Sequence, residues 1–267
     1  MNSQNSQKTQ NLQNRQNRQK ILGVIPARYA STRLPGKVLA DICGKPMIRR
    51  VYERALRAKC LTELVVATDD RRVADAVRAF AGEGAVVMTS PEHPNGSSRA
   101  AEVLKSRDAY AVINVQGDEP LLNPTMIDEV AEALFSGPDV LCSTLCRPLQ
   151  DEVDRENPNA VKVVCDRNGD ALYFSRSLIP YPRSTPRIPV YEHIGIYGYR
   201  ADFLRRYVEL PMTPLAEAES LEQLKVLEHG YKIRVAATRC EGAGPSVDTA
   251  EDLEAVRKIL SGMEGAR

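Results

Sequence analysis

The sequence predicts an α/β fold, in which a mostly parallel β-sheet is sandwiched by helices. Residues 21–25 form a short unbroken apolar run, which is typical of a strand buried on both faces of a sheet. Strand-like and helix-like segments then alternate along the chain, as parallel strands joined by right-handed crossovers require. The 267 residues are enough for one large α/β domain. We therefore expect a single Rossmann-like sheet to organise the chain.

In the first half of the chain, each expected element has its own signal. Apolar residues recur with helical spacing from Met47 onward. Asp69 and Asp70 precede a second helical segment, and they predict its start because aspartate is a favoured N-cap residue. We expect strands at residues 21–25, 64–67, 85–88 and 111–115, and helices at residues 47–59, 71–80 and 100–105.

The second half predicts a hairpin followed by mixed elements. Asn168 and Gly169 suit the turn between two short apolar strands. Gly230 ends a long helix, and prolines in residues 180–191 favour a loop. We expect strands at residues 161–165, 171–175, 194–199 and 233–237, and helices at residues 201–208, 217–229 and 249–260.

Composition excludes several functional classes. The 36 basic and 35 acidic residues nearly cancel, so no bulk charge favours nucleic acid or membrane binding. No apolar run reaches the roughly 20 residues of a membrane span, and no signal-peptide core is present. The six cysteines include no CxxC pair, which predicts buried free thiols in a reducing compartment. We expect a soluble cytoplasmic protein without nucleic acid or membrane partners.

Residues 1–20 are almost entirely Asn, Gln, Ser, Lys and Arg, and this tail has little to bury. The composition predicts a disordered tail. An organelle presequence is the alternative, because the tail is basic and lacks acidic residues. However, it has no amphipathic apolar face. The folded part is therefore expected at residues 21–267.

The loop after the first predicted strand is cationic. It has three positive charges, two hydroxyls and a tight turn at Arg28, Ser31, Thr32, Arg33, Pro35, Gly36 and Lys37. Nucleotides bind at the carboxyl ends of strands in open α/β sheets, so this loop fits a polyanion. The alternative is a solvated surface turn. Neither the Walker pattern nor GxGxxG fits, so the site would use cationic side chains where those families use backbone amides.

Two further loops follow predicted strands. Residues 90–99 are rich in turn formers and could either read a base or simply connect two elements. Asn95 and Gly96 there can take positive φ, which would turn backbone amides toward a ligand. Residues 116–120, Gln-Gly-Asp-Glu-Pro, place acids at the end of an apolar strand. Beside a cationic loop they suggest a divalent metal next to a polyphosphate, with an ordinary turn as the alternative.

Several longer motifs carry a resemblance. They are IPARYASTRLPGK, VINVQGDEP, NPNAVKVV, ALYFSR, HIGIYGYR, LEQLKVL and VDTAEDLEAVR. In this order the chain resembles the 3-deoxy-manno-octulosonate (Kdo) cytidylyltransferases over nearly all of residues 21–260. The resemblance implies a sugar nucleotidyltransferase fold, a homodimer, Mg²⁺ dependence, and activation of Kdo by CTP for lipopolysaccharide biosynthesis. It also implies that residues 157–230 contribute a smaller sugar-binding and dimerisation lobe.

The resemblance also assigns site residues by motif. It implies nucleotide binding by Pro26, Ala27, Arg28, Ser31, Arg33, Lys37, Asn95, Gly96, Arg99 and Gln116. It implies a reacting centre at Arg28, Lys37, Gln116 and Asp118, with Asp118 and Asp248 as metal ligands. It implies a sugar side at Arg176, His193, Tyr197, Glu222 and Gln223. From the residues alone, the sugar-side set would instead be a surface cation, two core positions and a solvated helix face.

One motif departs from the family pattern. Where the family has His-x-Ser-Gly-Thr-Asp/Glu-Arg, this chain has His93-Pro-Asn-Gly-Ser-Ser98-Arg99, so the acid is replaced by Ser98. The change leaves open a related keto-sugar acid, such as 8-amino-Kdo or a sialic-acid-like sugar. A non-catalytic nucleotide-sugar-binding protein is a further alternative. No general base is evident, and a metal held by Asp118 and Asp248 would make one unnecessary.

Overall fold

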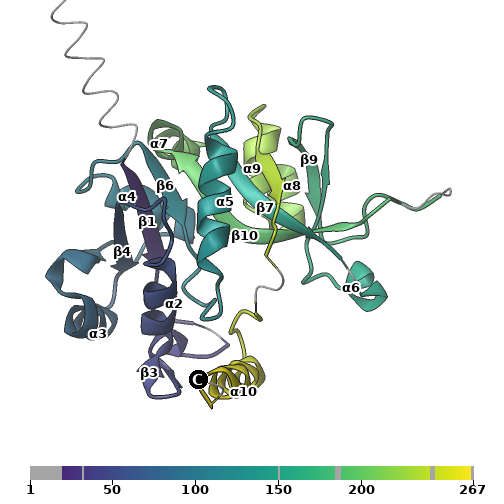
Figure 1. Cartoon of the computed structure of the whole chain (residues 1–267). Helices are drawn as coiled ribbons and strands as arrows, with labels where there is room; N and C mark the ends of the chain where they lie inside the picture. Colours follow the sequence, from purple (N-terminus) through teal and green to yellow (C-terminus); the bar gives the residue numbers. More distant parts are fainter. Residues whose placement is uncertain (1–19, 32, 150, 184–187, 241–243, 266–267) are drawn as a thin grey trace, which may run out of the picture. The chain divides into compact units, whose positions relative to one another are not determined.

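The computed structural model describes residues 20–31, 33–149, 151–183, 188–240 and 244–265 (Figure 1). The predicted disorder of residues 1–19 and the centre of the proline-rich loop therefore lie outside the described residues. The chain divides into two compact units. The first unit comprises Met1–Asp128 and Cys240–Arg267, and the second comprises Glu129–Arg239. The boundary expected for a smaller lobe, residues 157–230, stays a prediction.

The first unit contains a parallel sheet in the order β6-β1-β4-β5. Its strands are β1 (Ile21–Pro26), β4 (Glu63–Thr68), β5 (Val86–Met88) and β6 (Ala111–Asn114). Leu22, Val24 and Ile25 of β1 are completely buried, which explains the unbroken apolar run. The four strands predicted in the first half of the chain are confirmed. Their parallel pairing brings the loops after β1, β4, β5 and β6 to one edge of the sheet.

The helices of the first unit are α2 (Met47–Ala55), α3 (Arg71–Ala81), α4 (Gly96–Val103) and α10 (Ala250–Gly265). Short elements are η1 (Lys37–Leu39), η2 (Glu83–Ala85) and the hairpin of β2 (Asp41–Ile42) and β3 (Lys45–Pro46). The Asp70 side chain accepts a 2.8 Å hydrogen bond from the Arg72 N–H, so the predicted helix start is confirmed. Helix α5 (Pro124–Leu134), which was not predicted, crosses from the first unit into the second.

The start of α4 corrects the prediction for residues 90–99. The helix begins at Gly96, four residues before the expected start at Ala100. Asn95 is its N-cap at φ −152°, an extended conformation, and Gly96 is the first helical residue. The expected positive φ at these two residues is wrong, because the Asn95 side chain caps a helix instead of supporting a turn.

The second unit is built on a mixed sheet. Its strands are β7 (Cys142–Pro148), β8 (Lys162–Cys165), β9 (Ala171–Ser175), β10 (Tyr191–Arg200) and β11 (Arg234–Ala237). Strand β7 pairs in parallel with β11 and antiparallel with β10, while β8 pairs antiparallel with β9 and β10. Its helices are α6 (Glu152–Glu156), α7 (Ala201–Glu209), α8 (Pro214–Glu219) and α9 (Gln223–Glu228). The described pairs of the four-stranded sheet in the first unit are all parallel, and the second unit adds both parallel and antiparallel pairs, so the predicted α/β class is confirmed.

The long helix expected at residues 217–229 is wrong. It is two helices, α8 and α9, separated at Ser220, whose φ of 50° lies in the left-handed region. Tertiary contacts explain the break. The Glu219 carboxylate accepts hydrogen bonds from Ser175 Oγ at 2.6 Å and from the Arg176 N–H at 2.9 Å. The predicted stop at Gly230 is confirmed, since α9 ends at Glu228 and Gly230 takes φ 79°.

The cysteines differ in burial. All six cysteines are free, but only Cys142 and Cys146 are buried, so the prediction that all are buried thiols is wrong. Cys165 is exposed because its strand β8 lies away from the core there. In the described part of the chain, every helix is too short or too polar to cross a membrane.

Candidate active site

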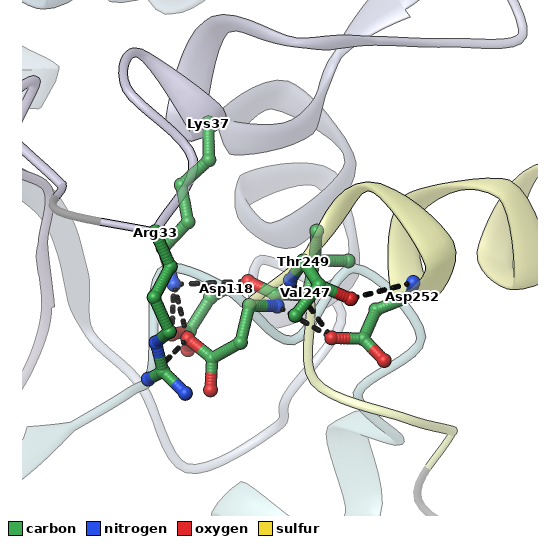
Figure 2. A network of polar contacts seen from close by, with 7 residues as sticks. Arg33, Lys37, Asp118, Val247, Thr249 and Asp252 are labelled. Carbon is green, nitrogen blue, oxygen red and sulfur yellow. Dashed lines mark hydrogen bonds and ion pairs between the residues drawn. The ribbon is translucent and has the colours of Figure 1, made fainter.

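Two carboxylates of the first unit meet at one ammonium group (Figure 2). Lys37 Nζ lies 2.8 Å from Asp118 Oδ2, 2.9 Å from Asp248 Oδ1 and 2.9 Å from the Val247 carbonyl oxygen. Arg33 Nη2 lies 3.0 Å from the same Asp248 oxygen. We call Arg33, Lys37, Asp118 and Asp248 the carboxylate cluster. The structure thus brings together residues 81 and 211 positions apart in the chain.

Local structure fixes each member of the carboxylate cluster. Gly36 takes φ 71°, which only glycine adopts easily, and Lys37 begins η1 directly after it. Asp118 follows β6, and the Val247 N–H donates to the Asp118 carbonyl oxygen at 2.9 Å. The Asp252 carboxylate accepts hydrogen bonds from the N–H groups of Asp248 and Thr249 at the start of α10. Backbone hydrogen bonds therefore hold the segments that carry Asp118 and Asp248.

The charges in this cluster balance locally. The Lys37 side chain is only 13% exposed, and burial acts to lower its pKa. Pairing with Asp118 and Asp248 outweighs burial, so the pKa of Lys37 is raised overall. The ammonium is therefore charged at neutral pH, and its three N–H donors have three acceptors within 2.9 Å.

The donor chemistry of the cluster fits the predicted Mg²⁺. Two carboxylates and one carbonyl supply only oxygen donors, which hard divalent cations prefer. No group of three or more His, Cys, Asp or Glu side chains that could hold a metal occurs within the described ranges. Mg²⁺ commonly binds one or two carboxylates and completes its shell with water and substrate phosphates. Asp118 and Asp248 are thus the residues that would hold it.

The nucleotide-side residues at the ends of β1 and β6 pack closely. A Cβ atom on Gly117 would lie 2.6 Å from the Pro26 carbonyl oxygen, so only glycine fits between Gln116 and Asp118. A Cβ on Gly96 would lie 3.2 Å from Pro26 Cγ. Ala27 is buried and donates its N–H to Ala67 O at 2.9 Å. The structure therefore brings Pro26, Gly96 and Gly117 together, with Ala27 and Gln116 next to them in the chain.

The cationic loop closes on itself. The Gly36 N–H donates to the Tyr29 carbonyl oxygen at 2.9 Å, and the Arg72 guanidinium lies over the Tyr29 ring, 3.4 Å from its centroid. Arg28 and Ser31 are half-buried in this loop, whereas Arg33 is exposed. The predicted anion-binding loop is therefore held by contacts of Tyr29, while Arg33 is accessible to a ligand.

Arg99 is completely buried in the first unit. Its Nη1 donates to Thr89 Oγ1 at 2.5 Å, and its Nη2 lies 3.4 Å from Asp69 Oδ2. Burial lowers the Arg99 pKa, while Asp69 raises it and Arg28 lowers it through charge repulsion. Arg99 therefore ties together the segments after β4 and β5, which sequence reasoning did not indicate. Half-buried Asp69 and buried Thr89 are therefore residues of this site that sequence reasoning missed, and their positions after predicted strands were the available signal.

The departure at Ser98 has a local structural account. Asn95 Oδ1 accepts a 2.8 Å hydrogen bond from the Ser98 N–H, and Ser98 Oγ donates to the Asn95 carbonyl oxygen at 3.0 Å. These contacts cap α4 without a carboxylate at residue 98. The Asn95 side chain is thereby engaged with its own helix.

The second unit holds the five residues predicted for the sugar side. The Arg176 guanidinium donates to the carbonyl oxygens of Glu219 at 2.7 Å, Pro158 at 2.9 Å and Ser220 at 3.3 Å. Arg176 directly follows β9 and is half-buried, and these three acceptors fix its guanidinium. Lys162, which is completely buried, donates to the Arg176 carbonyl at 2.8 Å and so fixes its backbone.

His193 and Tyr197 lie in a row of rings. Phe174 and Tyr197 contact the His193 ring with centroids 5.0 and 5.3 Å away, and the row continues through stacked Tyr199 and Tyr207. We call these five residues the aromatic row. His193 Nε2 lies 3.0 Å from Thr144 Oγ1. Desolvation lowers the pKa of His193 to about 3 and raises that of Tyr197 well above its usual range, so both are neutral at pH 7.

Glu222 and Gln223 start α9. Glu222 precedes the helix, and its carbonyl oxygen accepts a 3.2 Å hydrogen bond from the Tyr207 hydroxyl at the end of the aromatic row. Gln223 is buried, so the alternative reading as a solvated helix face is wrong for it. The second unit therefore joins His193, Tyr197 and Glu222 through contacts along the aromatic row, and Gln223 follows Glu222 in the chain.

Known proteins are similar in sequence over almost the whole length of this chain. Residues 22–233 match the family model described as Cytidylyltransferase. A 3-deoxy-manno-octulosonate cytidylyltransferase of Geobacter metallireducens is 50% identical, covering 91% of this chain and 98% of that protein. One of Fusobacterium nucleatum is also 50% identical, covering 89% and 95%. The chain belongs to the 3-deoxy-manno-octulosonate cytidylyltransferase family.

A solved structure agrees with this family assignment. The CMP:2-keto-3-deoxy-manno-octonic acid synthetase complexed with CTP is similar with a TM-score of 0.87 and 44% identity, covering 91% of this chain and 99% of that one. The predicted resemblance and the Rossmann-like nucleotidyltransferase fold are confirmed. As a member of this cytidylyltransferase family, the chain is a nucleotidyltransferase enzyme.

Proposed function

We propose that this enzyme transfers CMP from CTP to Kdo, giving CMP-Kdo and diphosphate for lipopolysaccharide biosynthesis in the cytoplasm. The names of relatives covering nearly their full lengths support the two substrates. The observation that carries the proposal is the carboxylate cluster, in which Lys37 joins Asp118 and Asp248 after the predicted phosphate loop. This arrangement combines an anion-binding cation with two carboxylates suited to Mg²⁺.

The chemistry requires mainly positioning and charge neutralisation. The anomeric hydroxyl of Kdo attacks the α-phosphorus of CTP, and the bond to diphosphate breaks in line. Arg28, Arg33 and Lys37 neutralise phosphate charge that grows on the leaving group. When bound at Asp118 and Asp248, Mg²⁺ supplies Lewis acidity toward the phosphate and hydroxyl oxygens. A separate protein base is then unnecessary.

Two residues of the second unit would offer uncharged hydrogen-bonding groups to the sugar. Neutral His193 and Tyr197 can exchange hydrogen bonds with sugar hydroxyls without adding charge. Glu222 and Gln223 add an acid and an amide at the start of α9. The Arg176 N–H and guanidinium are fixed on Glu219, so Arg176 shapes the neighbouring loop and would offer the carboxylate of Kdo its remaining exposed edge.

We also propose a homodimer formed through the second unit. Tyr181 and Ile188 are large apolar side chains that are 82% and 64% exposed, which supports burial against a second copy. Sedimentation equilibrium should give twice the chain mass. A Tyr181→Ser, Ile188→Ser double variant should shift the equilibrium toward monomer, and an unshifted dimer would place the interface elsewhere.

Diphosphate release tests the reaction directly. The purified enzyme, Mg²⁺ and CTP should release diphosphate with Kdo, and ATP or GTP should be poor replacements because a pyrimidine-sized pocket excludes purines. A panel with 8-amino-Kdo and a sialic acid tests the alternative suggested by Ser98. Faster release with one of these acids would reassign the sugar, and equal rates with ATP would overturn the cytidylyltransferase proposal. Release with none of the acids would favour the non-catalytic alternative.

A further inference from the structure

We propose that Lys37 is a built-in counter-cation that a divalent metal displaces from Asp118 and Asp248, and that displacement frees its ammonium for the triphosphate. This inference rests on the proposed function, because it concerns Mg²⁺ and CTP at the same site. The inference adds that Lys37 exchanges the two carboxylates for the triphosphate, so that metal binding and phosphate binding are coupled.

The first step of the argument is the number of donors. A lysine ammonium has three N–H groups and no acceptor. All three are directed at oxygens of Asp118, Asp248 and Val247, at 2.8, 2.9 and 2.9 Å. Figure 2 shows the Lys37 side chain running its full length toward Asp118 and Val247. In this arrangement Lys37 has no N–H left for a phosphate oxygen, so a phosphate contact requires it to leave at least one acceptor.

The second step is competition for the same oxygens. The carboxylate oxygens that contact Lys37 belong to the pair that would hold Mg²⁺. Mg²⁺ binds oxygen at about 2.1 Å, closer than the ammonium does. A divalent ion and an ammonium bound to the same oxygens would repel strongly, because both are mostly shielded from water. The Lys37 and Asp118 side chains are only 13% and 28% exposed, so solvent screens this repulsion weakly.

The third step is that Lys37 can move while the carboxylates stay. Its ammonium lies on a flexible four-carbon stem, so it can change partners by side-chain rotation alone. Asp248 has a much shorter side chain on a fixed backbone, because its N–H and that of Thr249 donate to the Asp252 carboxylate at 3.0 and 2.9 Å. Asp118 is likewise tied to Val247 through its backbone. The pair of carboxylates is therefore a fixed site, and Lys37 is the movable occupant.

Arg33 is unsuited to the same exchange. It reaches only Asp248, at 3.0 Å, and its side chain is 65% exposed. It neutralises the rim of the cluster and adds to the repulsion toward a metal, but it does not bridge the two carboxylates. Lys37 alone, among the described residues of this cluster, contacts both.

The consequence is that Mg²⁺ should bind weakly without nucleotide and more tightly with it. Without a phosphate, displaced Lys37 loses its two carboxylate acceptors and gains none from a ligand. With CTP present, the triphosphate receives the ammonium and supplies further metal ligands. Removing the Lys37 charge should therefore tighten metal binding to the nucleotide-free enzyme while impairing catalysis.

The experiment measures metal binding without turnover. Mn²⁺, whose free form gives a distinct electron paramagnetic resonance signal, is titrated into the nucleotide-free full chain as wild type, Lys37→Met and Lys37→Gln. We expect both variants to bind Mn²⁺ about tenfold or more tightly than wild type, because the competing charge is gone. Mg²⁺ should also raise the melting temperature of each variant more than that of wild type. The two neutral variants guard against misfolding of one of them.

Lys45→Met is the matched control. Lys45 is a half-buried lysine bonded to a carboxylate, Glu53, at 2.7 Å outside the cluster, so its removal should leave Mn²⁺ affinity unchanged. Adding Asp118→Asn to Lys37→Met should abolish the tight binding. Equal or weaker Mn²⁺ binding by both Lys37 variants overturns the inference, whether or not the enzyme forms CMP-Kdo. Failure of the diphosphate assay with tight Mn²⁺ binding in the variants would instead leave the exchange standing and reject the proposed reaction.

Discussion

The carboxylate cluster of the first unit and the aromatic row of the second are stabilised by different forces. In the cluster, three ion pairs of 2.8 to 3.0 Å link four charged groups in a row. In the aromatic row, desolvation keeps His193 and Tyr197 neutral. The first region is therefore sensitive to the loss of a single charge, and the second to loss of shape or to a gained proton. We therefore expect substitutions in the carboxylate cluster to affect mainly activity, and substitutions around the aromatic row to affect mainly stability.

Removal of either carboxylate should have the largest effect on activity. We expect Asp118→Asn and Asp248→Asn each to reduce kcat by about a hundredfold or more, because both would hold one Mg²⁺ centre. The double variant should be little worse than either single one, since groups acting as a unit are not additive. Rates measured across a Mg²⁺ titration check this.

The same variants test stability. Lys37 pairs with both carboxylates, so losing one should lower the melting temperature slightly. If the two losses of kcat multiply independently, or if Asp248→Asn is fully active, the shared metal site is wrong. Asp248 would then serve mainly at the start of α10.

The second unit also contains an important charge, the Lys162 ammonium, which we expect to stabilise the fold. Its buried ammonium donates to the carbonyl oxygens of Asn157, Ala160 and Arg176 at 2.9, 2.8 and 2.8 Å. Lys162→Met leaves these three carbonyl oxygens without the ammonium, which we expect to cost about 3 kcal/mol of unfolding free energy. Urea denaturation measures this loss. Lys225→Met is the matched control, because Lys225 donates to one carbonyl at 3.2 Å and should cost less.

His193 should make the stability of the second unit depend on pH. Burial lowers its pKa to about 3 in the folded protein from an ordinary value of 6.5, so the unfolded chain takes up the proton first. The stabilising effect is complete above pH 6.5 and is lost as pH falls toward 3, by at most about 1.4 kcal/mol per pH unit. His193→Gln should remove that part of the slope in urea denaturation between pH 6.5 and 4. His229→Gln should retain it, and an unchanged slope in His193→Gln would place the proton elsewhere.

A charge pair outside the cluster should have the smallest effect. Glu53 accepts from Lys45 and Arg49 at 2.7 Å, but all three side chains are more than a third exposed or close to it. Glu53→Gln should cost less than about 1 kcal/mol and leave kcat unchanged. A large loss of activity would mean that ion pairs throughout the first unit, and not only those of the cluster, support catalysis.

Much of the fold followed from local patterns. Buried strands such as β1 and capped helices such as α3 have their signals within a few residues. Helix α5 was not predicted, although Asn123 accepts from the Thr125 N–H and Pro124 begins the helix, which is a usable start signal. The break at Ser220 could not be predicted, because it depends on contacts from Ser175 and Arg176 that are more than 40 positions away.

The site was predictable in its residues more than in its contacts. The strand-end loops indicated a cationic and an acidic segment, and the family resemblance added Asp248. Neither showed that Lys37 would bridge both carboxylates, because that depends on folding residues 247–252 back beside the loops after β1 and β6. Arg99 was assigned to the nucleotide, yet its described partners are Thr89 and Asp69. Whether it contacts CTP stays a prediction.

The first unit is discontinuous, and this sets the order in which a ribosome can complete the enzyme. Met1–Asp128 supplies Lys37 and Asp118 early, but Asp248 arrives only after the whole of Glu129–Arg239 has been made. A growing chain therefore holds one carboxylate of the pair until residue 248 has been made. Chains cut short by proteolysis or premature termination before Asp248 would keep the cationic loop and lack the second carboxylate. If the pair holds Mg²⁺ as proposed, we expect such fragments to consume no CTP.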